Sequence, residues 1–331
     1  MKNPKIVLAI SPVNFLKDDY SILNHADDFF LWYVNISNTK ETEINNKRWY
    51  RYSNFNISDN KHIDMLKNIS KYKNKLWKKI NLVLNNIWLL DNINKIKQEI
   101  ETILKIIEID RFIVADFYML DFLEKNFPKI WINLSSLAIF SNLSHFWILK
   151  DYKNIKRIIL HRDIDEDSII DIIDYLTTEN INIELEYFAM NEWCYNIDWL
   201  CFSLHNIEDN IPFVCQRNWF YNNNLITKYM TERSNCQLCM LKNIENKAKK
   251  NKKSINIYDY IEYYKIPWRG HNSKIMSAYC KITKNIIKSL QNNNKIWYEK
   301  KKEIFLKLWN NIIRNNIIEN LFCWKCYYKN K

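Results

Sequence analysis

The sequence predicts an α/β fold: a TIM-like (β/α)8 barrel with a cysteine-rich insertion before the last strand and a C-terminal helical tail. Eight short β-type runs recur along the chain, and segments of helical period stand between several of them. The chain has 331 residues, 47% of them apolar, which is enough to bury a core of this size. Alternating β and α elements favour a parallel sheet, and eight units suffice to close a barrel.

The eight predicted strands are short runs rich in β-branched and aromatic residues. In chain order they are KIVLAI from Lys5, DDFFLWYV from Asp27, INLVL from Ile80, RFIVAD from Arg111, IWINLS from Ile130, RIILH from Arg157, INIELEYF from Ile181 and IEYYKI from Ile261. Residues at the ends of parallel strands face one mouth of a barrel. We expect Asp116, Ser135, Arg162 and Glu186 to meet there.

Two segments between these strands have a clear helical period. Between the third and fourth strands, apolar residues at 93, 96, 100, 103, 104 and 107 fall on one face of a helix. The run SIIDIIDYL from Ser168 has the same pattern between the sixth and seventh strands. Both helices are therefore of the kind that covers the outside of a barrel.

The repeating pattern breaks after Phe188. Residues 190–256 hold five cysteines, few periodic runs and the basic stretch LKNIENKAKKNKKS, which we interpret as a solvated loop with nucleic-acid contact as the alternative. We therefore predict a barrel-like catalytic domain over residues 1–272, with a cysteine-rich insertion at 190–256. A C-terminal helical tail follows over residues 273–331 and ends in the CxxC sequence CWKC.

Charge and hydropathy limit the classes of partner. The formal net charge of +12 permits a polyanion such as nucleic acid, although abundant Ile, Asn and Lys suggest an AT-rich genome whose codon drift contributes to that charge. The N-terminal apolar run is too short for a signal peptide, and no stretch reaches the roughly 18 apolar residues of a membrane span. The sequence thus predicts a cytoplasmic protein with no membrane span.

The cysteines are concentrated in the second half of the chain. None of the eight occurs before Cys194, and a reducing compartment favours metal ligands or catalytic thiols over disulfides. The five in the insertion are Cys194, Cys201, Cys215, Cys236 and Cys239. Four thiolates suit an iron–sulfur cluster or a tetrahedral zinc, and spacing alone does not separate the two metals.

The remaining three cysteines carry less information. Cys280 lies within the helical run MSAYCKIT, so we expect a buried apolar thiol. Cys323 and Cys326 either join the metal region, form a second site with zinc as its simplest metal, or are a pair of thiols on a tail.

The cysteine stretch and its flanks resemble the collagenase-like U-32 peptidase family, whose pattern is Glu-x-Phe-x-x-Gly-x-x-Cys, four residues, Gly-x-Cys and a nearby Ser. At the matching places this chain has Glu186, Phe188, Asn191, Cys194, Trp199, Cys201 and Ser203. RIILHRDI, with Arg157 and Arg162, is similar to the family's Arg-Val-Val-Leu-x-Arg-Glu strand. NLSSLAIFSN resembles its Ser-rich fifth-strand segment, and YKIPWRG, with Lys265 and Arg269, resembles Lys-Ile-x-Gly-Arg.

This resemblance implies a [4Fe-4S] cluster whose first three ligands are Cys194, Cys201 and Cys215. The fourth ligand is either Cys236 or Cys239, and we favour Cys239. Zinc stays the alternative metal. The resemblance further implies a site formed by Arg162, Glu186, Lys265 and Arg269, in which the three cationic side chains bind an anionic substrate; ordinary salt bridges at strand ends are the other reading. Several family members act in oxygen-independent hydroxylation of the ubiquinone ring or of RNA bases. RNA, a small aromatic molecule and a related second subunit are therefore the implied partners.

Two other functions stay open at this point. A peptidase needs an activated nucleophile or metal-bound water, and the six histidines form neither a His-Glu-x-x-His helix nor part of a Gly-x-Ser-x-Gly elbow; His161 is the best candidate for a site role. A non-catalytic partner subunit that holds a cluster or zinc is the third class. Pro267 stands where many relatives carry Glu, which bears on whether the reaction is shared.

Tryptophan replaces glycine at several family positions. Trp199 and Trp268 stand at two family glycines and Trp32 at a third, and the whole chain has 13 Trp but one Gly, when glycine averages about 7% of residues. AT drift depletes glycine, yet it should deplete the usual tryptophan codon as well. We hypothesise that many of these tryptophans come from UGA codons that the source organism reads as glycine. The alternative is a drifted homologue that tolerates tryptophan.

Overall fold

The structure is a computed structural model. It describes residues 2–10, 20–33, 54–55, 60–85, 93–138, 140, 142–162, 164–189, 220–221, 224–225, 237–251, 255–267 and 273–292. All eight predicted strands lie within these ranges, apart from Val34 at the end of the second.

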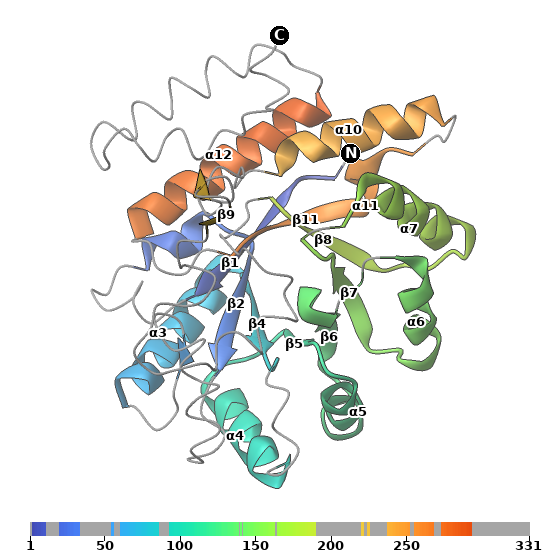
Figure 1. Cartoon of the computed structure of the whole chain (residues 1–331). Coiled ribbons are helices and arrows are strands. Elements are labelled where there is room, and N and C mark those ends of the chain that lie inside the picture. Colours follow the sequence, from blue (N-terminus) through green and yellow to red (C-terminus); the bar gives the residue numbers. More distant parts are fainter. Residues whose placement is uncertain are drawn as a thin grey trace.

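A closed parallel barrel of eight strands forms the centre of the molecule (Figure 1). Its strands are β1 (Lys5–Ile10), β2 (Asp28–Tyr33), β4 (Lys79–Val83), β5 (Arg111–Val114), β6 (Trp131–Leu134), β7 (Ile155–Ile159), β8 (Glu184–Phe188) and β11 (Ile261–Ile266). Strand β1 closes the ring because it pairs with β11 on one side and β2 on the other; Val7 is in register with both Lys265 and Asp28. All eight predicted strands are confirmed, as is the TIM-like fold class.

Three shorter strands add to this ring or lie apart from it. Strand β3 (Asn54–Phe55) pairs with the end of β2, where the backbone of Trp32 is in register with Asn54 and Val83. Strands β9 (Phe220–Tyr221) and β10 (Asn224–Leu225) form an antiparallel pair of their own.

Helices surround the barrel (Figure 1). The α-helices are α3 (Asn60–Leu76), α4 (Ile93–Ile106), α5 (Phe117–Asn126), α6 (Ile148–Asp151), α7 (Glu166–Thr178), α10 (Leu238–Lys250), α11 (Ile257–Tyr260) and α12 (Ser273–Gln291), with 3-10 turns at η1 (Ser21–Asn24), η3 (Ser136–Ala138) and η4 (Leu143–Trp147). The predicted helices after the third and sixth strands are α4 and α7. Asp165 caps α7, because its carboxylate accepts a hydrogen bond from Ser168 N–H at 2.8 Å.

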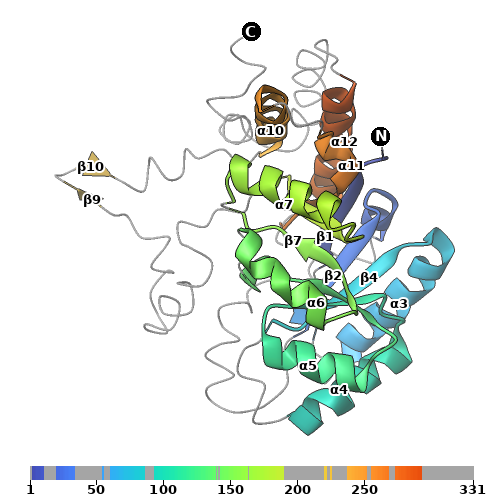
Figure 2. The ribbon, with the colours of Figure 1, turned by 90° about the vertical axis from the view of Figure 1, so that its right-hand side faces the viewer.

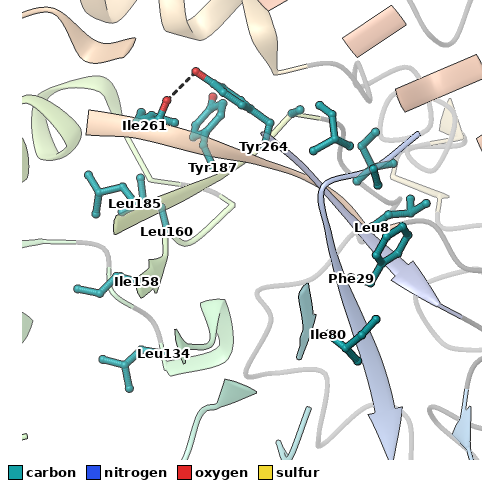
Figure 3. Packing of buried hydrophobic residues seen from close by; sticks show 14 of the residues in the cluster. Leu8, Phe29, Ile80, Leu134, Ile158, Leu160, Leu185, Tyr187, Ile261 and Tyr264 are labelled. Atoms are coloured by element: carbon teal, nitrogen blue, oxygen red, sulfur yellow. Dashed lines mark hydrogen bonds between the residues drawn. The ribbon is translucent and has the colours of Figure 1, made fainter. Parts of the chain in front are cut away.

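The main apolar core lies between the outer face of the barrel and these helices. Strand residues such as Leu8, Phe29 and Ile80 alternate with inward-facing neighbours and pack outward (Figure 3). Tyr264 also belongs to this core. Its buried hydroxyl has a hydrogen-bond partner there, because it donates to the Ile261 carbonyl at 2.8 Å. Cys280 of α12 is fully buried in the same core, as predicted, and burial raises the pKa of its thiol to about 12.

Helix α10 corrects the prediction that the basic stretch of the insertion is a solvated loop. Most of LKNIENKAKKNKKS is helical, and Leu241, Ile244 and Ala248 of its buried face join the main core. Lysines fill the other face, so the stretch is amphipathic rather than wholly polar. Helix α10 lies beside α7 and α12, where it takes the place of a barrel helix between β8 and β11 (Figure 2).

Helix α12 begins the segment predicted as a C-terminal tail. It packs on the barrel through Met276, Ile282 and Ile287, and Lys284 forms an ion pair with Asp27 at 3.1 Å. The division of the chain at residue 272 stays a prediction.

Two helices are followed by residues with positive φ. Asn180, after α7, has φ 52°, and Trp77, after α3, has φ 55°. Asparagine adopts this left-handed conformation readily, whereas glycine is the residue that fits it best. Trp77 is 90% exposed, so no packing accounts for the tryptophan.

Candidate functional site at the carboxyl ends of the strands

The middle of the barrel is filled by charged side chains rather than by the branched apolar layers usual in such barrels. Arg157 of β7 is fully buried, and its guanidinium donates to Asp28 Oδ2 at 2.8 Å, Glu184 Oε2 at 3.0 Å and Glu186 Oε2 at 2.8 Å. It also stacks on Tyr263, 3.4 Å from the ring centroid. One side chain therefore ties β7 to β2, β8 and β11.

Two further cations complete this network. Arg111 forms a bidentate pair with Glu184, and Lys265 Nζ lies 2.9 Å from Glu186 Oε1. Three carboxylates, Asp28, Glu184 and Glu186, thus face the three cations Arg111, Arg157 and Lys265. The balance of charge offsets the cost of burying each ion alone.

The pKa values within the network shift in different directions. Burial alone would raise the pKa of Glu184, but Arg111 and Arg157 lower it to about 2. The pKa of Glu186 is likewise lowered, because Lys265 and Arg157 outweigh its burial. Asp28 differs, since burial raises its pKa more than Arg157 lowers it. Burial opposes the charge of Arg157, yet its three carboxylates raise its pKa overall.

Lys265 and Glu186, both predicted site residues, therefore meet inside the barrel. Glu186 was expected at the mouth, but it is the third residue of β8 and is fully buried one layer below the strand ends. The alternation of the strand explains the difference, because the inward positions 184, 186 and 188 stack along the barrel axis. The Lys265 ammonium also lies 4.2 Å from the centroid of Phe30 and 5.7 Å from that of Phe188.

An apolar layer covers the charged network on the side of the mouth. Its inward-facing members include Ala9, Phe30, Val83, Ile113, Ile159 and Phe188. Polar residues follow directly at the strand ends: Asn85 after β4 and Ser135 after β6, both buried. The Asn85 Nδ2 group donates to Ser135 Oγ at 2.9 Å, across the intervening strand β5.

A second set of contacts joins β7, β8 and the start of α10. The Gln237 backbone N–H donates to the Ala189 carbonyl at 3.0 Å, and its side-chain Nε2 donates to the Arg162 carbonyl at 3.1 Å. Tyr187 Oη donates to the Gln237 carbonyl at 3.2 Å. Gln237 thus holds the first turn of α10, which contains Cys239, against the carboxyl ends of β7 and β8.

Three of the four residues expected at the mouth follow the ends of their strands. Arg162 follows β7, and its guanidinium carbon lies 5.4 Å from the centroid of Phe188. Ser135 follows β6, and Asp116 follows β5, where its carboxylate caps α5 by accepting from Tyr118 and Met119 N–H groups. Asp116 is therefore engaged in holding a helix end.

Several predicted residues lie outside the described ranges. They are Cys194, Cys201, Cys215, Cys236, Arg269, Trp199, Trp268, Cys323 and Cys326. Within the described ranges, no group of three or more His, Cys, Asp or Glu side chains could hold a metal ion. A cluster or zinc would therefore need ligands from the cysteine stretch, with Cys239 as the one candidate ligand placed on a described helix.

Sequence reasoning missed Asn85, Gln237 and the role of Asp28. Asn85 lies one residue beyond the predicted strand INLVL, and its alternation with Asn81 and Val83 is the signal that places it inward. Gln237 lies between the two cysteines of CQLC, a pattern that indicates metal ligation by the thiols and no role for the glutamine. Asp28 lies within a predicted strand, where a charge was unexpected.

No helix in the described part of the chain is both long and apolar enough to cross a membrane. The cytoplasmic location stays a prediction.

These features define a (β/α)8-barrel protein whose polar groups gather at the carboxyl ends of the strands, the face at which such barrels carry their active sites. The particular family follows from a family model described as Peptidase family U32, which matches residues 47–313. The chain belongs to peptidase family U32, as its resemblance to the U-32 motifs predicts.

Solved structures with a related arrangement have low sequence identity. The U32 peptidase Mk0906 has 10% identity and a TM-score of 0.46, over 82% of this chain and 95% of that one. The probable 3-DHS dehydratase AsbF from Bacillus anthracis has 13% identity and a TM-score of 0.42, over 84% and 98%. N-acetylneuraminate lyase from Mycoplasma synoviae has 12% identity and a TM-score of 0.38, over 92% and 78%. The comparison with curated proteins gives no match.

Proposed function

We propose that this U32 protein carries a [4Fe-4S] cluster at the mouth of its barrel and hydroxylates an aromatic ring, of a cofactor or an RNA base, without molecular oxygen. The observation that carries the proposal is the position of Gln237. It brings the turn containing Cys239 to Ala189, the residue from which the cysteine stretch departs. Cys194 follows Ala189 by five residues, so its tether spans at most about 18 Å.

The donor set fits the cluster chemically. Cys194, Cys201, Cys215 and Cys239 supply four thiolates, the ligand set of a [4Fe-4S] centre. When bound, the cluster supplies one-electron redox chemistry or activation of a substrate beside it. The same four thiolates also suit zinc, and iron analysis separates the two metals.

The reaction needs a co-substrate. Replacing a ring C–H by C–OH removes two electrons from the ring, so an oxygen-free route needs a donor that provides oxygen and accepts those electrons. An organic alcohol R–OH fills both roles when it leaves as R–H, and the atoms then balance. A cationic group beside the mouth, such as Arg162, suits an anionic substrate or donor.

The interior charges serve to support the mouth. Lys265 and Glu186 are both buried and pair with each other, so in this proposal they fix β8 and β11 rather than contact substrate. Both residues belong to the predicted catalytic set, and in this proposal they act as positioning residues.

The test is metal content and function of the full chain purified without oxygen. About four irons and four sulfides per chain, with broad visible absorption, are expected for the native protein. Cys194→Ala should lose the cluster. Cys280→Ala, in the main core, is the matched control and should keep it. Incubation with RNA and an alcohol donor under nitrogen should then add one oxygen atom to a nucleoside, as seen by mass spectrometry.

Other results would redirect the assignment. Zinc alone, or no metal in native protein and control alike, would overturn the cluster. Peptide cleavage without a cluster would instead support the peptidase reading. A cluster without oxygen transfer to RNA would leave a cofactor ring as the substrate, or a non-catalytic partner subunit, as the functions to test next.

A further inference from the structure

Asn85 presents an unpartnered oxygen at the mouth of the barrel. The residue is 6% exposed, and its Oδ1 atom is buried and has no hydrogen-bond partner among the described residues. Leaving a buried acceptor without a partner lowers the stability of a folded protein. A polar group that lowers the stability of the free protein and lies at a functional face is expected to find its hydrogen-bond partner in a bound ligand.

Ser135 orients the Asn85 amide in this structure. Its Nδ2 group donates to Ser135 Oγ at 2.9 Å, and Ser135 Oγ also accepts from Leu137 N–H at 3.2 Å. Both residues are anchored to β5, because Leu84 N–H donates to the Ile113 carbonyl and Ser135 N–H to the Val114 carbonyl. With Nδ2 donating to Ser135 Oγ, the Oδ1 atom of the amide is left for another partner.

Asn85 points into the barrel. Asn81 and Val83, four and two positions earlier, both face the interior, and the period of a strand places Asn85 on the same side. Below it lie Val83 and Ile113 of the apolar layer, which offer a nonpolar support for a flat ring. The Oδ1 atom stands at the edge of that support as a hydrogen-bond acceptor.

Two other buried asparagines have unpartnered atoms but do not compete for this role. Asn81 Oδ1 and Asn133 Nδ2 have no partner among the described residues either. Both lie inward of the apolar layer, beside Asp28 and Arg111 of the charged network. Asn85 instead lies beyond the end of β4, on the side of the mouth.

We propose that Asn85, oriented by Ser135, accepts a hydrogen bond from an N–H group on the edge of a planar substrate ring and so determines which ring is taken. This inference rests on the proposed function and refines it. A ring that carries N–H donors, such as a nucleobase, satisfies the acceptor. A quinone ring offers carbonyl oxygens only, which the amide oxygen repels.

The experiment measures binding of nucleosides to the full chain purified with its cluster under nitrogen. The probes are adenosine, cytidine, guanosine and uridine, each compared with a derivative whose base N–H groups are all methylated, and binding is followed by ligand-observed NMR titration. At least one nucleoside should bind native protein about two- to tenfold more tightly than its methylated form, the range expected for one net hydrogen bond.

Variants test whether Asn85 causes the preference. Asn85→Ala should abolish it, Asn85→Asp should retain it because an acceptor remains, and Ser135→Ala should reduce it. Asn154→Ala, a partly exposed asparagine ahead of β7 whose side chain donates to the Pro128 carbonyl, is the control and should leave it unchanged. The preference is the ratio of the affinities for a nucleoside and for its methylated form. A general loss of stability affects both affinities alike and does not abolish the preference.

Each contrary outcome is decisive. If no nucleoside binds, if methylated forms bind as tightly, or if Asn85→Ala keeps the preference, the inference is wrong. Iron and sulfide are measured on the same samples. A missing cluster marks failure of the proposed function, whereas an intact cluster without N–H preference marks failure of this inference alone.

Discussion

Trp77 has a backbone conformation that strongly favours glycine. It follows the last residue of α3 with φ 55°, and its indole is exposed, so the side chain contributes no packing to offset the strain. A residue with a Cβ atom in this conformation costs roughly 1–2 kcal/mol. Trp77 was not among the tryptophans matched to family glycines, so it is an independent position of the same kind.

We expect Trp77→Gly to stabilise the protein. The relieved strain exceeds the entropy that glycine adds to the unfolded chain, which leaves a gain on the order of 0.5–1 kcal/mol in the free energy of unfolding. Urea denaturation measures it. Asn180→Gly is the control, because asparagine already tolerates φ 52° and a smaller gain is expected there. A loss of stability in Trp77→Gly would contradict the strain argument.

The same position tests the codon hypothesis in the native organism. If UGA is read as glycine, peptides covering residue 77 should have the mass of glycine, and those covering residues 199 and 268 should agree. Tryptophan at all three positions would show that the chain tolerates tryptophan where relatives have glycine. The structure supports the hypothesis at residue 77, whereas Trp32 has an ordinary strand backbone in β2 and residues 199 and 268 are outside the described ranges.

At the scale of single elements, α10 shows where sequence patterns mislead. LKNIENKAKKNKKS contains six lysines, and this high average polarity favours a solvated loop. Its Leu241, Ile244 and Ala248 nevertheless have helical spacing. A helix with a charged outer face looks polar on average, and only the periodicity reveals its buried side. The helices α4 and α7 were predictable because their apolar residues are more numerous.

Helix α10 is also the element that positions Cys239, and Gln237 anchors it. We expect Gln237→Ala to remove the bond to the Arg162 carbonyl while leaving the backbone bond to Ala189. The stability loss should be modest, about 0.5–1.5 kcal/mol. Cluster retention should fall much more, because the turn that holds one thiolate loses a fixed point. Iron content after exposure to air measures it.

Gln291→Ala provides the matched control for this change. Gln291 also donates one side-chain hydrogen bond to a backbone carbonyl, that of Lys2, at the end of α12. Its loss should affect stability little and iron content not at all. If both glutamine variants keep iron equally well, Gln237 does not support the metal region.

At the scale of the whole molecule, the sequence predicts the closed barrel but not the charged network inside it. Runs of alternating or continuous apolar residues identify strands, because each strand is covered by helices on its outer face. The charged interior leaves a weaker trace. Asp28, Arg157 and Glu184 are scattered over three strands, and their pairing depends on a register that no local pattern specifies. Family motifs pointed to Arg157 and Glu186, but not to their mutual contact.

The charged interior makes stability dependent on acid. Glu184 accepts from Arg111 and Arg157 and lies 3.4 Å from the Tyr263 hydroxyl, and its pKa is lowered from 4.5 to about 2. A carboxyl with a lower pKa in the folded state stabilises that state fully above pH 4.5. The contribution is lost as the pH falls from there toward about 2. Glu186 acts in the same direction, whereas the raised pKa of Asp28 opposes it.

Glu184→Gln should therefore destabilise the protein most at neutral pH, where the loss of charge leaves Arg111 and Arg157 short of a partner. The difference between native and variant should shrink as the pH falls below 4.5, because native Glu184 is then increasingly protonated too. Urea midpoints of both proteins across this range measure the convergence, and Glu101→Gln on the exposed side of α4 is the control. A difference that stays constant from pH 7 to pH 3 would mean that Glu184 stabilises the barrel through packing rather than through its charge.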